Sequence, residues 1–333
     1  MNRILVVGPS WVGDMIMAQS LFKVLIQQRS GCRITVLAPS WSEPILARMP
    51  EVTSSIAMPV GHGRLEIAQR WRLSRALKSQ FDQAIVLPGS FKSALIPWFA
   101  GIKRRTGFIG EQRYGLLNDY RKLDQRALPF SVQRFVALGH ESGQPPIPLD
   151  RIPWPVLEIE SDRRQQICSQ FGLNDQTPII ALCPGAEYGP AKQWPPDHFA
   201  EVAKHQFELN RQVVILGSEK DRAAANLICR IANGCIDLTG ETSLGDAVDL
   251  MSAASHVVTN DSGLMHVAAA VGCHVVAIYG SSSDAFTPPL TNTADRLYLD
   301  LPCRPCFQRH CPLGHLDCLH KLGAAQVIEV LDN

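Results

Sequence analysis

Short, uninterrupted apolar runs alternate with segments of helical periodicity along the whole chain. Such runs, rich in β-branched residues and placed between helices, are typical of parallel strands covered on both faces. The predicted strands are residues 3–7, 33–38, 84–87, 178–183, 212–217, 256–259 and 274–279. The predicted helices include residues 14–28, 197–208, 221–232, 244–253 and 263–271. The pattern predicts an α/β protein in which each half forms a Rossmann-like βαβ domain.

A proline-rich segment separates the two halves. Five prolines fall within residues 145–155, which excludes a helix interior or a central strand there and favours a stiff connector. The length of 333 residues also fits two domains, at about 100–200 residues each. We expect an N-terminal domain of residues 1–155 and a C-terminal domain of residues 156–333, with a cleft between the carboxyl ends of both sheets.

Composition narrows the class of protein. Hydrophobic residues make up 46% of the chain and charged residues 19%, which excludes a disordered chain. No apolar run reaches the roughly 18 residues of a membrane-spanning helix, and the start lacks the pattern of a signal peptide. We therefore expect a cytoplasmic protein whose ten cysteines are thiols and not disulfides.

Charge is divided unequally between the halves. Residues 1–155 hold 20 Lys and Arg against 10 Asp and Glu, a net charge of +10, whereas residues 156–333 hold 12 against 21, a net charge of −9. A basic half is typical of proteins with an anionic partner such as nucleic acid, a phosphorylated glycan or a membrane surface. Mutual attraction of the two halves is an equally good explanation.

The first candidate site is the loop after the first predicted strand. Residues 8–14 read Gly-Pro-Ser-Trp-Val-Gly-Asp, and glycines at a helix start let a ligand approach the backbone amides. The glycine spacing differs from the dinucleotide fingerprint, and Asp14 stands where a Walker loop needs lysine, which argues against a nicotinamide cofactor and against a P-loop. By position alone, Asp14 fits a helix N-cap better than a catalytic base.

The second candidate is the loop after the strand at 178–183. Residues 184–195 contain a glycine-rich turn that can form an anion-binding nest, and Lys192 adds a positive charge. The alternative is an ordinary loop with a solvated lysine. Because residues 156–333 have a net charge of −9, a lysine in this loop is more suggestive of a bound ligand.

The third candidate is the loop after the strand at 256–259. Asp261 and Ser262 begin a helix, Gly263 allows close approach, and a helix N-terminus favours phosphate. A packed first-turn residue is the alternative for His266. Because this loop and the second one end strands of one sheet, both can meet one bound nucleotide.

A cysteine-rich segment is the last candidate. It contains Cys303, Cys306, Cys311 and Cys318, interleaved with His310, His315 and His320. Structural zinc sites usually combine two short paired knuckles, and only the first cysteine pair has that spacing. We therefore favour a loop without metal over a zinc site.

Taken together, these loops resemble the signatures of glycosyltransferase family nine, the bacterial lipopolysaccharide heptosyltransferases. The matching segments are Ile4-Leu5-Val6-Val7-Gly8-Pro9-Ser10-Trp11-Val12-Gly13-Asp14-Met15, Pro184-Gly185-Ala186-Glu187 with Lys192-x-Trp194-Pro195, and Asn260-Asp261-Ser262-Gly263-Leu264-Met265-His266. The Gly-Pro-Ser-Trp opening and the tail from Pro305 to Cys318 resemble the members that add the second heptose. The resemblance spans nearly the whole chain and implies a GT-B fold with the acceptor domain first and the donor domain second.

The resemblance also implies individual roles. Asp14 matches the catalytic aspartate, which reverses the preference for a cap, and Lys192 matches the lysine that contacts the donor phosphates during catalysis. The implied donor-binding residues are Ala186, Glu187, Tyr188, Lys192, Glu219, Thr242, Ser243, Leu244, Asp261, Ser262, Gly263 and His266. Glu219 matches the acid that holds the ribose, with Asp221 as a rival, and residues 242–244 enclose the adenine. Glu187 and Tyr188 stand where related enzymes carry two threonines, so backbone amides are expected to bind phosphate there.

The implied activity is an inverting transfer of L-glycero-D-manno-heptose from ADP-heptose to the inner-core heptose of Kdo2-lipid A. A carboxylate must accept the proton of the attacking hydroxyl, and Lys192 with the loop amides stabilises the departing ADP. No Asp-x-Asp pair lies in a loop to hold Mg²⁺, so neither a metal nor another cofactor is expected. The alternatives are transfer of the first or third heptose, a nucleotide-sugar epimerase and a non-enzymatic nucleotide-binding scaffold.

The implied acceptor site falls in the basic half. Ser10, Trp11 and Gly13 belong to the first loop, and Lys92 follows the strand at 84–87. A basic cluster comprises Lys103, Arg104, Arg105, Arg113, Arg121, Lys122, Arg126 and Arg134, opposed by Glu111, Asp119 and Asp124. A solvated face is the better explanation for any single arginine. For the set we expect contact with acceptor phosphate and carboxylate groups and with the anionic inner face of the cytoplasmic membrane, and no nucleic acid.

Overall fold

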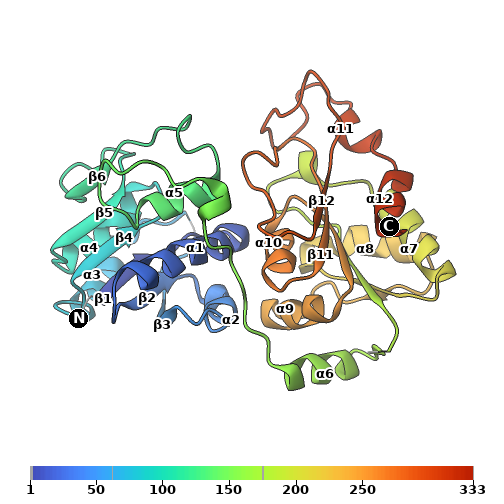
Figure 1. Ribbon diagram of the computed structural model, residues 1–333, viewed down its shortest axis with the longest axis horizontal. Helices are drawn as coiled ribbons and strands as arrows, with labels where there is room; N and C mark the ends of the chain where they lie inside the picture. The colour runs from blue at the N-terminus through green and yellow to red at the C-terminus, as the bar shows by residue number, and fades with distance from the viewer. Residues whose placement is uncertain (1–2, 62, 175, 333) are drawn as a thin grey trace. The chain divides into compact units, whose positions relative to one another are not determined.

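The computed structural model describes residues 3–61, 63–174 and 176–332, and it divides into two compact units, Met1–Pro155 and Val156–Asn333. The division falls directly after the proline-rich segment, which contains no α-helix and no strand among its described residues. Each unit carries a parallel sheet with helices on both faces (Figure 1). Within the described ranges, no helix is long and apolar enough to cross a membrane.

The first unit is built on a six-stranded sheet with the order β3-β2-β1-β4-β5-β6. Its strands are β1 Arg3–Val7, β2 Arg33–Ala38, β3 Val52–Ala57, β4 Gln83–Val86, β5 Arg104–Phe108 and β6 Asp119–Arg121. Its α-helices are α1 Val12–Gln28, α2 Glu43–Leu46, α3 Ile67–Ala76, α4 Leu95–Phe99 and α5 Ser131–Ala137, with 3-10 turns η1 Ser40–Ser42, η2 Phe91–Ala94 and η3 Leu149–Arg151. Every strand pair is parallel, so all six carboxyl ends share one edge.

Helices cover both faces of this sheet. Leu5 and Val7 of β1 pack into a core with residues of α4, whereas Ile4 and Val6 point to the opposite face. On that basis α3 and α4, which pack together, cover one face, and α1 with α5 covers the other (Figure 1). A strand buried on both faces explains why β1 is an apolar run without alternation.

The second unit has a six-stranded parallel sheet with the order β12-β11-β10-β7-β8-β9. Its strands are β7 Ile179–Cys183, β8 Gln212–Ile215, β9 Ile236–Asp237, β10 His256–Asn260, β11 His274–Ile278 and β12 Ala294–Leu297. Its α-helices are α6 Ser161–Gln170, α7 Pro196–Glu208, α8 Arg222–Ile231, α9 Leu244–Ala253, α10 Gly263–Ala270, α11 Asp317–His320 and α12 Ala324–Asp332, with η4 Pro190–Lys192 and η5 Glu219–Asp221. Numbered from its first strand, this order repeats that of the first unit.

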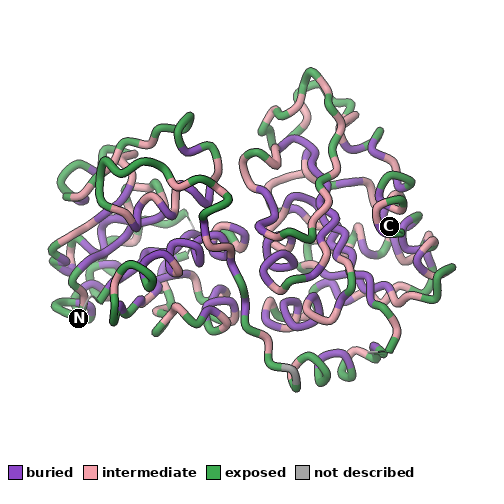
Figure 2. The backbone as a smooth tube through the Cα atoms, viewed as in Figure 1, coloured by how far each residue is buried: buried purple, intermediate pink, exposed green. Residues whose placement is uncertain are grey.

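A hydrophobic core of the second unit lies between its sheet and the helices α7, α8 and α12. Trp194 is at its margin with 1% of its surface exposed, and its indole N–H donates to the Leu322 carbonyl at 2.7 Å. Phe199 of α7 contacts the Trp194 ring edge-on at 4.8 Å between centroids. The central strands are buried along almost their whole length (Figure 2). A packed tryptophan thus anchors the end of the loop that carries Lys192.

The two Rossmann-like sheets confirm the predicted α/β fold class. The central strands and the helices at α7, α8, α9 and α10 lie within two residues of their predicted bounds. The sequence pattern missed β3, β5, β6, β9 and β12. Four of these, β3, β6, β9 and β12, are edge strands, and the five have polar or short sequences that lack the continuous apolar run of a central strand.

Candidate active site

Each sheet reverses its direction of strand addition at one point, between β1 and β4 in the first unit and between β7 and β10 in the second. In open α/β sheets, ligands bind outside the carboxyl ends of the strands that flank this point. The loops that follow β1, β7 and β10 are the three that sequence analysis selected. The topology therefore places all three at switch points.

In the second unit, the side chain of Asn260 joins the loops after β7 and β10. Its Oδ1 accepts a hydrogen bond from the Trp194 backbone N–H at 3.0 Å, and its Nδ2 donates to the Pro184 carbonyl at 2.7 Å. Asn260 is completely buried. One amide thus fixes the first and the penultimate residue of the 184–195 loop against the end of β10.

A lysine–aspartate pair lies between the same two loops. Nζ of Lys192 is 2.5 Å from Oδ2 of Asp261, and the side chains are 16% and 4% exposed. The hydroxyls of Ser282 and Thr287 donate to the Asp261 carboxylate as well, the second at 3.3 Å. Ser282 and Thr287 were missed by sequence analysis, although Gly-Ser-Ser-Ser at residues 280–283, two residues after the end of β11, could have indicated a third loop at this edge.

His266 lies on the first turn of α10 and is 4% exposed. Its pKa is lowered to about 4, chiefly by burial; the charge of Asp261 opposes this shift and the charge of Lys192 adds to it. The imidazole is therefore neutral at pH 7, which suits a hydrogen-bonding group beside Lys192 better than a cation. Ser262 is the N-cap residue of α10, so the unpaired amides of the first turn begin at Gly263.

The ribose and adenine candidates lie at the neighbouring carboxyl ends of β8 and β9. The two loops are joined by a hydrogen bond from the Gly240 N–H to the Gly217 carbonyl at 3.0 Å. Arg222 donates to Glu219 and also to Glu241, and its hydrogen bonds lower the pKa of the exposed Glu219. Ser243, which lies between Thr242 and Leu244, is the N-cap residue of α9 and exchanges hydrogen bonds with Asp246.

Asp221, the rival of Glu219, is already occupied. Its carboxylate accepts from the backbone N–H of Ser218 at 2.8 Å and from the Ser218 hydroxyl at 2.9 Å. It also packs against Gly185, where a Cβ would come within 2.4 Å of Asp221 Oδ1. Asp221 therefore shapes the loop base, and the exposed Glu219 is the acid that a ligand can reach.

Of the remaining donor candidates, Tyr188 holds a position that the sequence did not indicate. Its hydroxyl donates to the Phe307 carbonyl at 2.6 Å, and Lys192 Nζ lies 5.0 Å from its ring centroid. Ala186 is buried, and Glu187 is exposed and paired with Lys220 at 2.5 Å. The cysteine-rich tail therefore touches the Lys192 loop, a contact across 119 residues that local patterns do not reveal.

In the first unit, the loop after β1 is narrow. A Cβ on Gly8 would lie 2.8 Å from Met15 Cε, which explains the glycine. Trp11 is 41% exposed and is the N-cap residue of α1, so Asp14 is the third helical residue and the N-cap interpretation of Asp14 is wrong. Ser10 precedes Trp11, Gly13 is the second residue of α1, and Lys92 lies in η2 at the carboxyl end of the adjacent β4.

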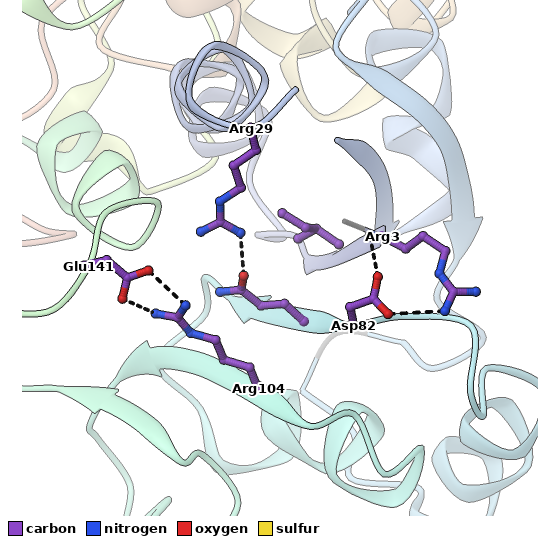
Figure 3. Close-up of a pocket in the computed structure, with 7 residues that line it drawn as sticks. Arg3, Arg29, Asp82, Arg104 and Glu141 are labelled. Carbon is purple, nitrogen blue, oxygen red and sulfur yellow. Dashed lines mark hydrogen bonds and ion pairs between the residues drawn. The ribbon is translucent and has the colours of Figure 1, made fainter. Parts of the chain in front are cut away.

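The structure does not bring Lys103, Arg104 and Arg105 of the predicted basic cluster to this edge. Arg104 begins β5 beside Gln83, the first residue of β4, so Lys103, Arg104 and Arg105 lie at the amino ends of the strands. Arg104 binds Asp119 and Glu141 there, and with Arg3 and Arg29 it lines a pocket of about 340 Å³ (Figure 3). Parallel strands put the start of β5 at the edge opposite the loop that carries Asp14, and a role of these three residues in acceptor binding stays a prediction.

Most other arginines of the cluster bond backbone carbonyls. Arg105 donates to Leu116 and Ile102, both at 2.6 Å, and the fully buried Arg113 donates to Pro88 at 2.6 Å. Further arginine–carbonyl bonds join Arg121 to Ala137 and His140, and Arg134 to Leu128. Burial lowers the pKa of Arg105, Arg113, Arg121 and Arg134. These side chains fasten loops, and counting formal charges overstated the free basic surface.

The four tail cysteines are free thiols on the segment between β12 and α12. Backbone N–H groups of residues 313–316 surround the Cys311 sulfur, and these hydrogen bonds lower its pKa. Burial and the neighbouring thiols raise the pKa of Cys318. Among the described residues, no group of three or more His, Cys, Asp or Glu side chains is arranged to hold a metal ion.

Two Rossmann-like units with phosphate-suited loops at their switch points are the architecture of the GT-B fold. The sequence matches the family model "Glycosyltransferase family 9 (heptosyltransferase)" over residues 70–317. The chain belongs to this family, as the three signatures indicated.

Individual relatives specify the branch. Lipopolysaccharide heptosyltransferase 2 of Escherichia coli K12 is 50% identical over 304 residues, covering 88% of this chain and 86% of its own. Lipooligosaccharide heptosyltransferase 2 of Haemophilus influenzae is 46% identical, covering 88% and 87%. The solved structure of E. coli ADP-heptose lps heptosyltransferase II matches with a TM-score of 0.90 and 44% identity, covering 100% and 98%.

Proposed function

We propose that this glycosyltransferase moves L-glycero-D-manno-heptose from ADP-heptose to the inner-core heptose of Kdo2-lipid A. The observation that carries the proposal is the Lys192–Asp261 pair at the switch point of the second sheet, in a chain half identical to lipopolysaccharide heptosyltransferase 2. A lysine held by a buried carboxylate is fixed in place before a diphosphate arrives. Fixed charges stabilise a transition state without reorganising during the reaction.

In this proposal the second unit binds the donor. Lys192, the loop backbone at residues 186–188 and the amides at Ser262 and Gly263 contact the diphosphate, with neutral His266 beside them. Glu219 holds the ribose hydroxyls, since Asp221 is occupied by Ser218. Residues 242–244, joined to the Glu219 loop through Arg222 and Glu241, enclose the adenine.

The first unit binds the acceptor. Asp14 accepts the proton of the attacking hydroxyl, because a sugar hydroxyl is a poor nucleophile at neutral pH. Ser10, Trp11, Gly13 and Lys92 lie at the same edge of the sheet and position the acceptor. Attack at the anomeric carbon from the side opposite ADP inverts its configuration.

A transfer assay with purified enzyme tests the proposal. The enzyme is incubated with ADP-heptose and either Kdo2-lipid A or heptosyl-Kdo2-lipid A, and the products are separated by mass. We expect one added heptose on the heptosylated acceptor and none on the other. Transfer to the acceptor without heptose would identify a first-heptose enzyme, and an altered free nucleotide sugar would identify an epimerase. Binding without either reaction would leave only a scaffold.

We further propose that the enzyme works in the cytoplasm at the inner face of the cytoplasmic membrane. Lys103, Lys122 and Arg126 are exposed, unlike the arginines that bond carbonyls, and anionic lipid attracts such groups. Neutralising all three should reduce cosedimentation with phosphatidylglycerol vesicles at low salt. Equal sedimentation of this variant and the wild type would contradict membrane contact through these residues.

A further inference from the structure

The cations at the carboxyl edge of the second unit are mostly neutralised by carboxylates. Lys192 pairs with Asp261, Lys220 with Glu187, Arg222 with Glu219 and Glu241, and Arg296 with Asp284. The unit as a whole has a net charge of −9. A diphosphate that binds here therefore meets a Lys192–Asp261 pair of no net charge, inside an acidic domain.

Two described arginines at this edge make no ion pair with a described carboxylate, Arg304 and Arg309. Arg304 is partly buried, stacks over Tyr298 at 4.2 Å and donates through Nε to the Gly280 carbonyl, so it supports the loop after β11. Arg309 is exposed. Its guanidinium Cζ lies 5.1 Å from the Tyr188 ring centroid, and Lys192 Nζ lies 5.0 Å from the same centroid. The two charges are thus no more than about 10 Å apart.

The backbone of Arg309 is locked to the turn that carries Lys192. The Ala191 N–H donates to the Arg309 carbonyl at 3.1 Å, and a Cβ on Gly189 would lie 2.7 Å from that oxygen. The Tyr188 hydroxyl bonds the Phe307 carbonyl, two residues before Arg309. Only glycine at position 189 permits this approach, so the backbone of Arg309 is held against the turn that carries Lys192, and the exposed guanidinium lies over the Tyr188 ring.

We propose that Arg309, on the cysteine-rich segment, binds the diphosphate of the nucleotide-sugar donor together with Lys192. A guanidinium presents a planar set of donors that matches two phosphate oxygens, whereas an ammonium is a point charge. Arg309 supplies the net positive charge that the Lys192–Asp261 pair lacks. This role deepens the proposed function and rests on it, because it assumes a donor with a diphosphate.

Binding measurements on the full chain test the role of Arg309. ADP affinity is measured by calorimetry and adenosine affinity by ligand-observed NMR for the wild type, Arg309→Ala and Arg309→Gln. We expect both variants to bind ADP about tenfold more weakly, the effect of one lost charged hydrogen bond, and adenosine as the wild type does. Both substitutions keep the carbonyl that Ala191 binds, so the turn stays docked.

Arg230→Ala is the matched control. Arg230 is an exposed arginine in the last turn of α8, it makes the same change in charge, and it should leave ADP affinity unchanged. Wild-type ADP affinity in both Arg309 variants would overturn the proposal. Equal losses for ADP and adenosine would also overturn it, because Arg309 would then act only through the loop's fold. A wild-type enzyme that binds no ADP would instead overturn the proposed function itself, and the role of Arg309 with it.

Discussion

The Lys192–Asp261 contact makes a quantitative prediction about the stability of the second unit. Exposed ion pairs contribute about 0–1 kcal/mol, whereas removal of one partner of a buried pair costs about 3–5 kcal/mol. Side-chain exposures of 16% and 4% place this pair close to the buried limit. Asp261→Asn also weakens the bonds from Ser282 and Thr287. We expect Lys192→Met and Asp261→Asn each to destabilise the unit by roughly 3 kcal/mol.

The double variant should be far less damaged than the two single variants together. The double variant removes both charges, so no buried charge is left without a partner. The coupling free energy between the two substitutions should therefore reach about 2 kcal/mol. Native-state hydrogen exchange of the β10 amides in the full chain measures it, because these buried backbone groups exchange only when the second unit opens. This measurement does not require both units to unfold in one step.

Lys220 and Glu187 form the matched control, with the same 2.5 Å separation but side chains 71% and 57% exposed. In the corresponding double-mutant cycle, the losses of unfolding free energy caused by Lys220→Met and Glu187→Gln should be close to additive, because water screens the pair. A Lys192–Asp261 coupling below about 0.5 kcal/mol, the usual limit of additivity, would refute the buried-pair reasoning. Coupling of equal size in both cycles would refute the claim that burial decides it.

Three further predictions concern the reaction and its conditions. Asp14→Asn should lower the rate of heptose transfer by about 10²–10⁴-fold with ADP affinity unchanged, and near-normal turnover would return Asp14 to a structural role. Burial lowers the pKa of His266 to about 4 from 6.5, so the unfolded chain binds more protons between these values. The free energy of unfolding should therefore fall as pH drops from 6.5 toward 4, by up to about 1.4 kcal/mol per pH unit from this residue. In His266→Gln, the free energy of unfolding measured by urea titration should depend less on pH across that window. Transfer should persist in EDTA; a loss that Mg²⁺ restores would contradict this, and a loss that only zinc restores would implicate the cysteine segment.

The sequence was sufficient to predict the central strands and the positions of three loops. Apolar runs of a strand buried on both faces are visible without tertiary information, and the carboxyl-end rule then groups the loops that follow them. The contact of Lys192 with Asp261 needed the structure, because 69 residues separate them. Edge strands such as β12, Ala-Asp-Arg-Leu, carry no pattern that distinguishes them from loops.

The basic cluster shows where reasoning from charge fails. Arg104 and Arg105 follow each other directly in the sequence, yet the first binds two carboxylates and the second binds two backbone carbonyls. Formal charge does not indicate which arginines fasten loops and which reach a ligand. Arg309 is the opposite case, because nothing in the sequence around this single arginine of the cysteine-rich tail indicates that its backbone lies against Gly189.

The bond between Tyr188 and Phe307 spans 119 residues, and this separation has a consequence for the order in which the enzyme matures. Ribosomes add about 5–20 residues per second, so the turn that carries Lys192 is made some 6–24 s before the segment that supports it. During that interval the β7 and β8 strands can already pair, while the turn at residues 188–191 has no partner for Ala191 N–H or the Tyr188 hydroxyl. Nascent chains that contain the turn at residues 188–191 but not yet Phe307 are thus expected to be unable to hold nucleotide. Donor affinity appears only after the cysteine-rich tail has docked.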